Sequence, residues 1–243
     1  MCTVSWWIDE NGYDLFFNRD ESRSRVAAQR PTRHKSAKGT PFLSPIDPQG
    51  GGSWIFVNAH GLTACILNHY AADFSDTPVK TSRGKLLLSL ADARSAADID
   101  TILKGAVAAD LYRPCFILSL TLEEEAHLWC WDGKSLTTDL RLTRPMLTTS
   151  SFDTENILAS RAAAFKKLSS RDLDDLRAFH RADGMDADAS TVRMSRPDAR
   201  SVSFTHVSVN SQLACVDYAA RLGEGPFAQP LDGLTLSISK EGE

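Results

Sequence analysis

The opening 21 residues, MCTVSWWIDENGYDLFFNRDE (1–21), decide the fold of this chain. Two runs of β-forming residues flank Asn11-Gly12, and Asn-Gly between such runs is a strong hairpin signal because both turn positions tolerate positive φ. Pairing these two strands brings their outer ends together. The opening therefore predicts that Cys2 lies beside the polar stretch 18–21.

Length and composition are those of an ordinary globular protein. The 243 residues are 42% hydrophobic and 24% charged, and the formal net charge of −4 argues against nucleic-acid or anionic-membrane partners. The five cysteines form no CxxC pair, which argues against a disulfide framework and a metal site. We find no export-signal pattern and no run near the ~18 apolar residues that span a bilayer. We expect a reduced, cytoplasmic protein without a membrane span.

The remaining sequence predicts more hairpins and two blocks of helix. The expected strands are 53–58, 62–68, 115–120, 126–131, 136–142, 201–209, 212–218 and 234–239. The expected helices are 82–95, 96–109, 153–167 and 173–179. We expect irregular loops over 22–50, which is polar and contains four prolines, and over 183–199. This order predicts one α+β domain, 1–243, with mostly antiparallel sheets covered by helices.

Cys2 directly follows the initiator Met1. A small second residue allows Met1 to be removed, which leaves a cysteine with a free α-amino group. An α-amine has a pKa of ~7.7–8.0, so it is partly a free base near neutral pH. It can take the proton of the adjacent thiol, so that one residue supplies both nucleophile and base. A processed but inert terminus is the alternative.

The stretch 18–21, Asn-Arg-Asp-Glu, supplies charges near this cysteine. The guanidinium of Arg19 would favour the thiolate, and the carboxylate of Asp20 would hydrogen-bond the α-ammonium. Asn68, at the end of an expected strand, could donate to a developing oxyanion. The alternatives are that 18–21 is only a charged turn and that Asn68 is only a residue at the end of a strand.

Taken together, these segments resemble the NRDE family, whose eukaryotic members are called transport and Golgi organisation protein 2. The resemblance covers about residues 1–90. The matching segments are Met1-Cys2-Thr3, Asn18-Arg19-Asp20-Glu21, Gly51-Gly52-Ser53-Trp54, Asn58, Gly61, Asn68 and Ser82-Arg83-Gly84.

More distantly, the opening is similar to conjugated bile salt hydrolases and penicillin V acylases. That resemblance implies a four-layer αββα sandwich of the N-terminal-nucleophile hydrolase type and cleavage of amides other than peptide bonds. It implies that Cys2 is the nucleophile, that Arg19 stabilises its thiolate and that Asp20 anchors the amine. Asn68 would be an oxyanion donor or a substrate contact, and Asn18 and Glu21 would contact substrate.

Three further positions are candidates on the same resemblance. Thr149 stands where related acylases place an oxyanion-hole asparagine, and its shorter hydroxyl puts acylase-type turnover in question. Arg200, at the entry to a strand, matches a late arginine near the nucleophile, or is a solvated strand-end residue. Arg83 is a possible contact to a substrate anion, or a residue at a helix N-terminus.

The favoured function is an amidohydrolase in which Cys2 forms a thioester with a small-molecule acyl amide. Trp6, Trp7 and Phe17 hint at an apolar acyl group. The alternative is a non-catalytic binding protein on the same fold, for haem or for lipid or acyl-CoA ligands, with Cys2 as a haem ligand or a structural residue. An interaction protein with a decayed site is the third hypothesis. The hydrolase requires no cofactor, and the sequence does not predict an oligomeric state.

Overall fold

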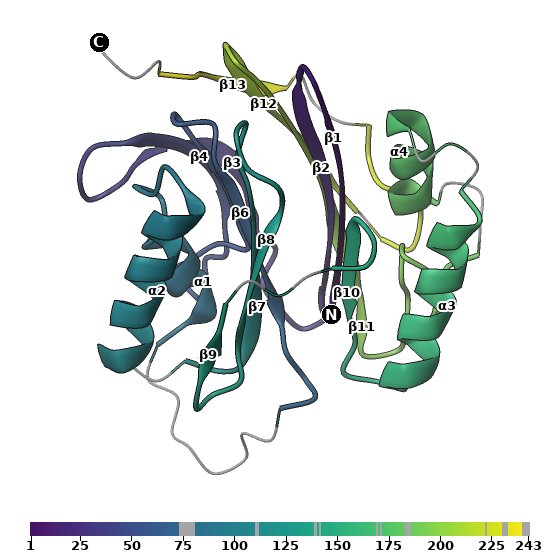
Figure 1. Cartoon of the computed structure of the whole chain (residues 1–243). Helices are drawn as coiled ribbons and strands as arrows, with labels where there is room; N and C mark the ends of the chain where they lie inside the picture. The colour runs from purple at the N-terminus through teal and green to yellow at the C-terminus, as the bar shows by residue number, and fades with distance from the viewer. Residues whose placement is uncertain are drawn as a thin grey trace.

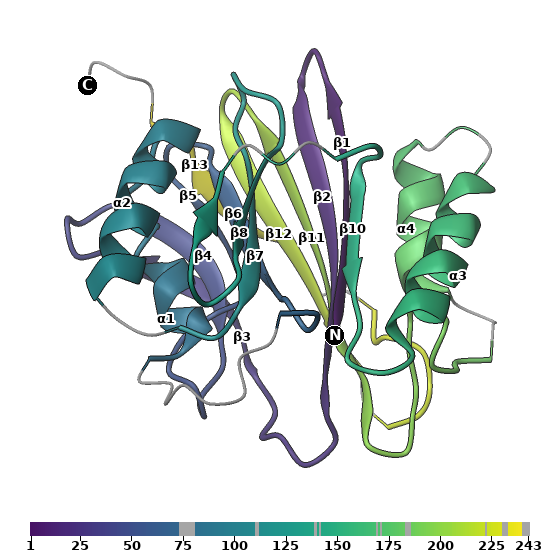
Figure 2. The ribbon, with the colours of Figure 1, turned by 60° about the horizontal axis from the view of Figure 1, so that its bottom comes forward.

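Two antiparallel sheets pack face to face, and helices cover both outer faces (Figures 1 and 2). This computed structural model describes residues 1–72, 81–109, 112–138, 140, 142–168, 170, 172–182, 186–221, 223–229 and 233–239. Helices α1 (Arg83–Leu88) and α2 (Ala96–Ala109) lie outside one sheet. Helices α3 (Thr154–Lys166) and α4 (Leu173–Arg181) lie outside the other. The four-layer αββα sandwich expected from the sequence is confirmed.

The first sheet has six strands in the order β10-β1-β2-β11-β12-β13. Their bounds are β1 (Cys2–Asp9), β2 (Gly12–Ser22), β10 (Met146–Thr149), β11 (Ala199–Asn210), β12 (Leu213–Ala220) and β13 (Leu234–Ser237). The predicted hairpin is β1–β2, with Cys2 paired to Arg19. Because β1 lies inside this sheet, Cys2 pairs on its other side with Thr149 of β10.

The second sheet has seven strands in sequential order, β3 to β9. Their bounds are β3 (Gln29–Lys35), β4 (Pro41–Ile46), β5 (Ile55–Asn58), β6 (Thr63–Asn68), β7 (Cys115–Leu120), β8 (His127–Trp131) and β9 (Leu136–Thr137). Among the described helices, none is long and apolar enough to cross a membrane.

The expectation of a loop over 22–50 is wrong, because β3 and β4 lie within it. β3 is the edge strand of its sheet and is largely exposed, so it tolerates polar side chains, and Pro31 falls where the β3–β4 register shifts. The helix expected over 82–95 ends at Leu88. Beyond it, the Asn58 side-chain amide donates to the carbonyls of Ala91 and Ala93, so the chain turns there.

Smaller differences concern two other segments. Of the strand expected over 136–142, β9 covers Leu136–Thr137, and residues 139 and 141 lie outside the described part of the chain. The loop expected over 183–199 ends where β11 begins at Ala199, and residues 183–185 of it also lie outside the described residues.

The main hydrophobic core lies between the two sheets, and a second cluster lies under α3 and α4. Side chains of a strand alternate between its two faces. Trp6 and Phe17 accordingly belong to the core between the sheets, whereas Trp7 packs against the second cluster. These aromatic residues stabilise the fold, so they do not support an apolar acyl group at the Cys2 site.

His180 of α4 links the second cluster to the hairpin. Its ring nitrogens lie 2.8 Å from Ser5 Oγ and 3.2 Å from Asn18 Oδ1, and the residue is fully buried. Burial lowers the pKa of His180 to about 3, and the nearby Arg161 contributes to the shift. The imidazole therefore stays neutral in the folded protein at pH values where it is protonated in the unfolded chain.

We expect this histidine to weaken the protein in acid. Below pH ~6.5 the unfolded state binds a proton that the native state excludes until about pH 3. Between these values His180 alone should remove about 1.4 kcal/mol of unfolding free energy per pH unit. Urea denaturation of wild type and His180→Gln at pH 4.5 to 7.5 measures this. Equal pH slopes for the two proteins would contradict it, whatever the absolute loss of stability in the variant.

Candidate active site

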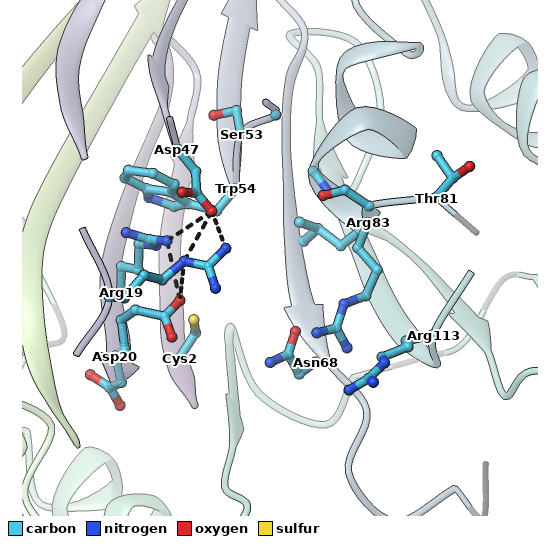
Figure 3. A pocket seen from close by; sticks show the side chains of 16 residues that line it. Cys2, Arg19, Asp20, Asp47, Ser53, Trp54, Asn68, Thr81, Arg83 and Arg113 are labelled. Atoms are coloured by element: carbon cyan, nitrogen blue, oxygen red, sulfur yellow. Dashed lines mark hydrogen bonds and ion pairs between the residues drawn. The ribbon is translucent and has the colours of Figure 1, made fainter. Parts of the chain in front are cut away.

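The Cys2 side chain opens into a cavity of ≈ 390 Å³ at one end of the sandwich (Figure 3). We call it the Cys2 cavity. Its lining residues are Cys2, Arg19, Asp20, Glu21, Arg25, Asp47, Gly52, Ser53, Trp54, Ile66, Asn68, Thr81, Ser82, Arg83, Gly84 and Arg113. The hairpin supplies one wall, and the second sheet with the start of α1 supplies the other. Most of these side chains are polar, so the cavity suits a polar ligand.

Cys2 is 8% exposed, and the environment of its thiol combines opposing effects. Burial raises the pKa of the Cys2 thiol, and the charge of Asp20 raises it further. The positive N-terminal amine, the nearby Asp20 backbone N–H and the Arg19 guanidinium act to lower that pKa. While Cys2 is joined to Met1, burial prevails and the thiol stays protonated.

Arg19 is held beside Cys2 by two carboxylates and an aromatic ring. Its Nη2 lies 3.2 Å from Glu21 Oε2 and 3.5 Å from Asp47 Oδ2, and its guanidinium carbon lies 4.2 Å from the Trp54 ring centroid. Glu21, predicted as a substrate contact, lines the cavity and orients Arg19. These contacts fix a cation next to the thiol.

Arg25 and Asp47 complete this network, and the sequence analysis missed both. Arg25 forms an ion pair with Asp47 and lies 3.4 Å from Glu21 Oε2. Although burial raises the pKa of Asp47, the guanidinium groups of Arg25 and Arg19 hold it below its usual value. No spacing in the sequence relates Asp47 to position 19, because the contact forms only when the two sheets pack.

Asp20 lines the cavity, but its carboxylate points away from the Cys2 thiol (Figure 3). Its Oδ1 accepts a 2.5 Å hydrogen bond from Ser201, and its Oδ2 lies 3.6 Å from Arg161 Nη2. Among the described residues, Oδ2 receives no hydrogen bond. Its backbone N–H donates to the Met1 carbonyl at 3.1 Å. The Asp20 backbone therefore holds Met1, whereas its carboxylate contacts Ser201 and Arg161.

Asn68, at the end of β6, faces Cys2 across the cavity (Figure 3). Its side-chain amide donates to the Tyr70 hydroxyl at 2.6 Å, and the Met1 amine donates to the same oxygen at 2.8 Å. Burial raises the pKa of Tyr70 to about 12, so its hydroxyl stays protonated. The Tyr70 hydroxyl thus connects the Met1 amine to the Asn68 side chain.

Two sequence motifs, Gly-Gly-Ser-Trp (51–54) and Ser-Arg-Gly (82–84), meet at the wall of the cavity. A Cβ added to Gly52 would lie 2.3 Å from the Gly84 carbonyl carbon, so both positions require glycine. Ser53 N–H donates to the Gly84 carbonyl at 3.2 Å, which fixes the start of α1 against the segment that leads through Trp54 into β5. This close approach places Arg83 on the cavity wall.

The structure places three predicted site residues outside the cavity lining. Asn18 is fully buried on the opposite face of β2, where its amide donates to the carbonyls of His180 and Val192. It cannot contact substrate there. Alternation along β2 could have revealed this, because residues 18 and 20 face one way and 19 and 21 the other.

Arg200 pairs in register with Glu21 but turns outward, where it donates to the Gly223 carbonyl and lies 3.4 Å from Glu224 Oε1. It is a strand-end arginine rather than a cavity residue.

Thr149 pairs with Cys2 without lining the cavity. Its buried hydroxyl finds no hydrogen-bond partner in the described part of the chain. Among the residues that the structure describes, no group of three or more His, Cys, Asp or Glu side chains could hold a metal ion.

The family model for Transport and Golgi organisation 2 matches residues 1–181. The chain belongs to this family. The match includes both walls of the Cys2 cavity, so the cavity lies in the part of the chain that the family shares. No curated protein matches the sequence significantly.

Solved structures similar to this member of the Transport and Golgi organisation 2 family share its fold. A mutant conjugated bile acid hydrolase from Clostridium perfringens matches with a TM-score of 0.55 and 12% identity over 99% of this chain and 97% of that one. Penicillin V acylase from Agrobacterium tumefaciens matches with a TM-score of 0.53 and 12% identity over 93% and 84%. The Caenorhabditis elegans orthologue of N-acylethanolamine-hydrolyzing acid amidase matches with a TM-score of 0.55 and 11% identity over 85% and 92%. The fold is therefore that of the N-terminal-nucleophile hydrolases.

Proposed function

We propose that this protein is an amidohydrolase that uses Cys2, exposed by removal of Met1, to cleave a non-peptide acyl amide. The observation that carries the proposal is the position of the Cys2 thiol, which opens into the cavity beside the Arg19 guanidinium and opposite the Asn68 amide. The fold neighbours named as a bile acid hydrolase, an acylase and an acid amidase add support at the level of fold.

Removal of Met1 would leave an amine directly on the nucleophilic residue. The Met1 carbonyl bonds to Asp20 of β2, so in an antiparallel ladder the next backbone nitrogen, that of Cys2, faces β10 instead. The new α-amine would therefore lie beside Thr149, whose hydroxyl lacks a partner among the described residues. Such an amine has a pKa of ~7.7–8.0 and can take the thiol proton near neutral pH.

The proposed reaction has two steps. The Cys2 thiolate attacks the amide carbonyl, a C–S bond forms, and the α-ammonium returns its proton to the leaving amine as the C–N bond breaks. Water, deprotonated by the same α-amine, then attacks the thioester and releases the acid, and the proton returns to the thiolate. We assign oxyanion stabilisation in both steps to the Asn68 amide, because this side chain faces Cys2 across the cavity.

Alkylation of Cys2 with iodoacetamide tests the proposal, together with the intact mass of the protein. We expect loss of Met1, and Cys2 alkylation at neutral pH at least about tenfold faster than in a form with lysine inserted after Met1. The inserted lysine blocks Met1 removal, and burial then keeps the thiol pKa raised. A tenfold ratio corresponds to about one pKa unit of thiol activation.

The Cys2→Ala variant serves as the control, because alanine still permits Met1 removal while the four other thiols remain. Burial raises the pKa of Cys115 to about 12, so that thiol should stay unreactive in both forms. Retained Met1 in the wild type, or equal Cys2 alkylation rates in the two forms, would contradict the proposal.

A further inference from the structure

Four arginines line the Cys2 cavity, and they fall into two kinds. Arg19 and Arg25, on the hairpin side, face the carboxylates of Glu21 and Asp47 within 3.5 Å. The charges on that side are therefore mutually compensated, and these two guanidinium groups are already engaged.

Arg83 and Arg113 lie together on the opposite wall (Figure 3). Arg83 donates from Nη1 to the Pro114 carbonyl at 3.1 Å, and neither arginine has an ion-pair partner among the residues that the structure describes. Burial lowers the pKa of Arg83, and the positive charge of Arg113 contributes to that shift. Two neighbouring cations, of which Arg83 is partly buried and Arg113 is exposed, would be stabilised by an anion between them.

We propose that Arg83 and Arg113 form an anion-binding subsite, and that Cys2 acts on an acyl amide that carries a carboxylate or a phosphate. The catalytic half of this inference rests on the proposed function, whereas anion binding does not. A guanidinium presents a planar fork of donors that matches both groups with two parallel hydrogen bonds.

The order of groups across the cavity determines the orientation in which the substrate would bind. In Figure 3, Asn68 lies between the Cys2 thiol and the two guanidinium groups. An amide carbonyl placed between Cys2 and Asn68 therefore leaves one end of the molecule directed at Arg83 and Arg113. The sequence suggested a substrate with an apolar acyl group. Because the cavity lining is mostly polar, we infer instead a substrate with an anionic end.

The first experiment compares two alkylating probes on the wild-type protein, 4-(iodoacetamido)benzoate and its neutral analogue 4-(iodoacetamido)benzamide. We expect Cys2 to react at least about tenfold faster with the anionic probe, because a charged hydrogen bond contributes about 1.5–3 kcal/mol. This preference should disappear in Arg83→Gln/Arg113→Gln. It should persist in Arg30→Gln/Arg33→Gln, which removes the same two positive charges from the exposed edge strand β3.

The second experiment does not use the thiol. Inorganic phosphate and acetate are titrated into Cys2→Ala by calorimetry, and the titration is repeated with the two arginines replaced. Binding that is lost with Arg83 and Arg113 supports the subsite, and the tighter ion distinguishes phosphate from carboxylate substrates. If Cys2 is unreactive but the ions bind at these arginines, the subsite stands and the proposed hydrolase fails. If Cys2 is reactive but shows no charge preference, and neither ion binds, the subsite is refuted.

Discussion

Replacing Arg161 with methionine will destabilise the protein by about 3–5 kcal/mol, because it leaves a carboxylate buried without its countercharge. Arg161 and Asp20 are both fully buried at their side chains, and Arg161 Nη2 lies 3.6 Å from Asp20 Oδ2. Arg161 Nη1 also donates to the hydroxyls of Thr3 and Thr148 at 2.9 and 3.0 Å. One guanidinium thus joins α3 to the strands on both sides of Cys2.

Urea denaturation at pH 7 measures this loss, and a double variant separates charge from packing. Arg161→Met/Asp20→Asn removes both charges, so we expect it to recover more than half of the stability lost in the single variant. Replacement of the exposed Lys104, which pairs with Asp100 on α2, should change stability by less than about 1 kcal/mol. A loss of that small size in Arg161→Met would show that the buried pair does not stabilise the layer beneath Cys2.

Gly52→Ala will cost about 3 kcal/mol and will also disturb the Cys2 cavity. The added Cβ would lie 2.3 Å from the Gly84 carbonyl carbon and 2.5 Å from the Lys85 nitrogen. Both are backbone atoms, so relief requires α1 to move away from the second sheet. Because Arg83 is the first residue of α1, this movement also displaces the wall that carries the proposed anion subsite.

Gly105→Ala is the matched control for this substitution. Gly105 lies inside α2, and a Cβ added there meets no atom within 4 Å. Alanine should therefore stabilise the helix by about 0.5–1 kcal/mol. Denaturation midpoints measure both variants. If Gly52→Ala proved as stable as the wild type, the close approach of Gly52 to Gly84 would not be what positions α1.

The sequence predicted most of the strands because the relevant signals are local. The Asn11-Gly12 pair located the first hairpin, although the turn itself is Glu10-Asn11, because Gly12 already pairs with Asp9 at the start of β2. The same hairpin predicted that Cys2 lies beside the stretch 18–21, and the structure pairs Cys2 with Arg19 of that stretch. β3 was missed because an edge strand can be polar and contain proline, so its sequence carries no clear alternation of apolar residues. β4 is a buried interior strand, and it was missed because Pro41 and Pro45 within it are typical of a loop.

Arg161 shows why the layer beneath Cys2 could not be predicted. A charged side chain on a helix is normally exposed, so the apolar spacing of α3 gives no reason to place an arginine inward. It is buried because Asp20, more than a hundred residues earlier in the chain, lies opposite it in the folded protein. Pairings of this kind depend on which layers pack together.

By itself, the sequence determined the antiparallel α+β sandwich, the family and the meeting of Cys2 with Arg19, because turn chemistry and strand periodicity act between neighbouring residues. Only the tertiary structure decided which charges surround that cysteine. Packing of the two sheets brings Asp47 to Arg19 and sets Arg83 and Arg113 on the opposite wall. The faces of β2 direct Asn18 away from the cavity and leave Arg19 and Glu21 within it. These contacts form between segments distant in the chain, and no local pattern specifies them.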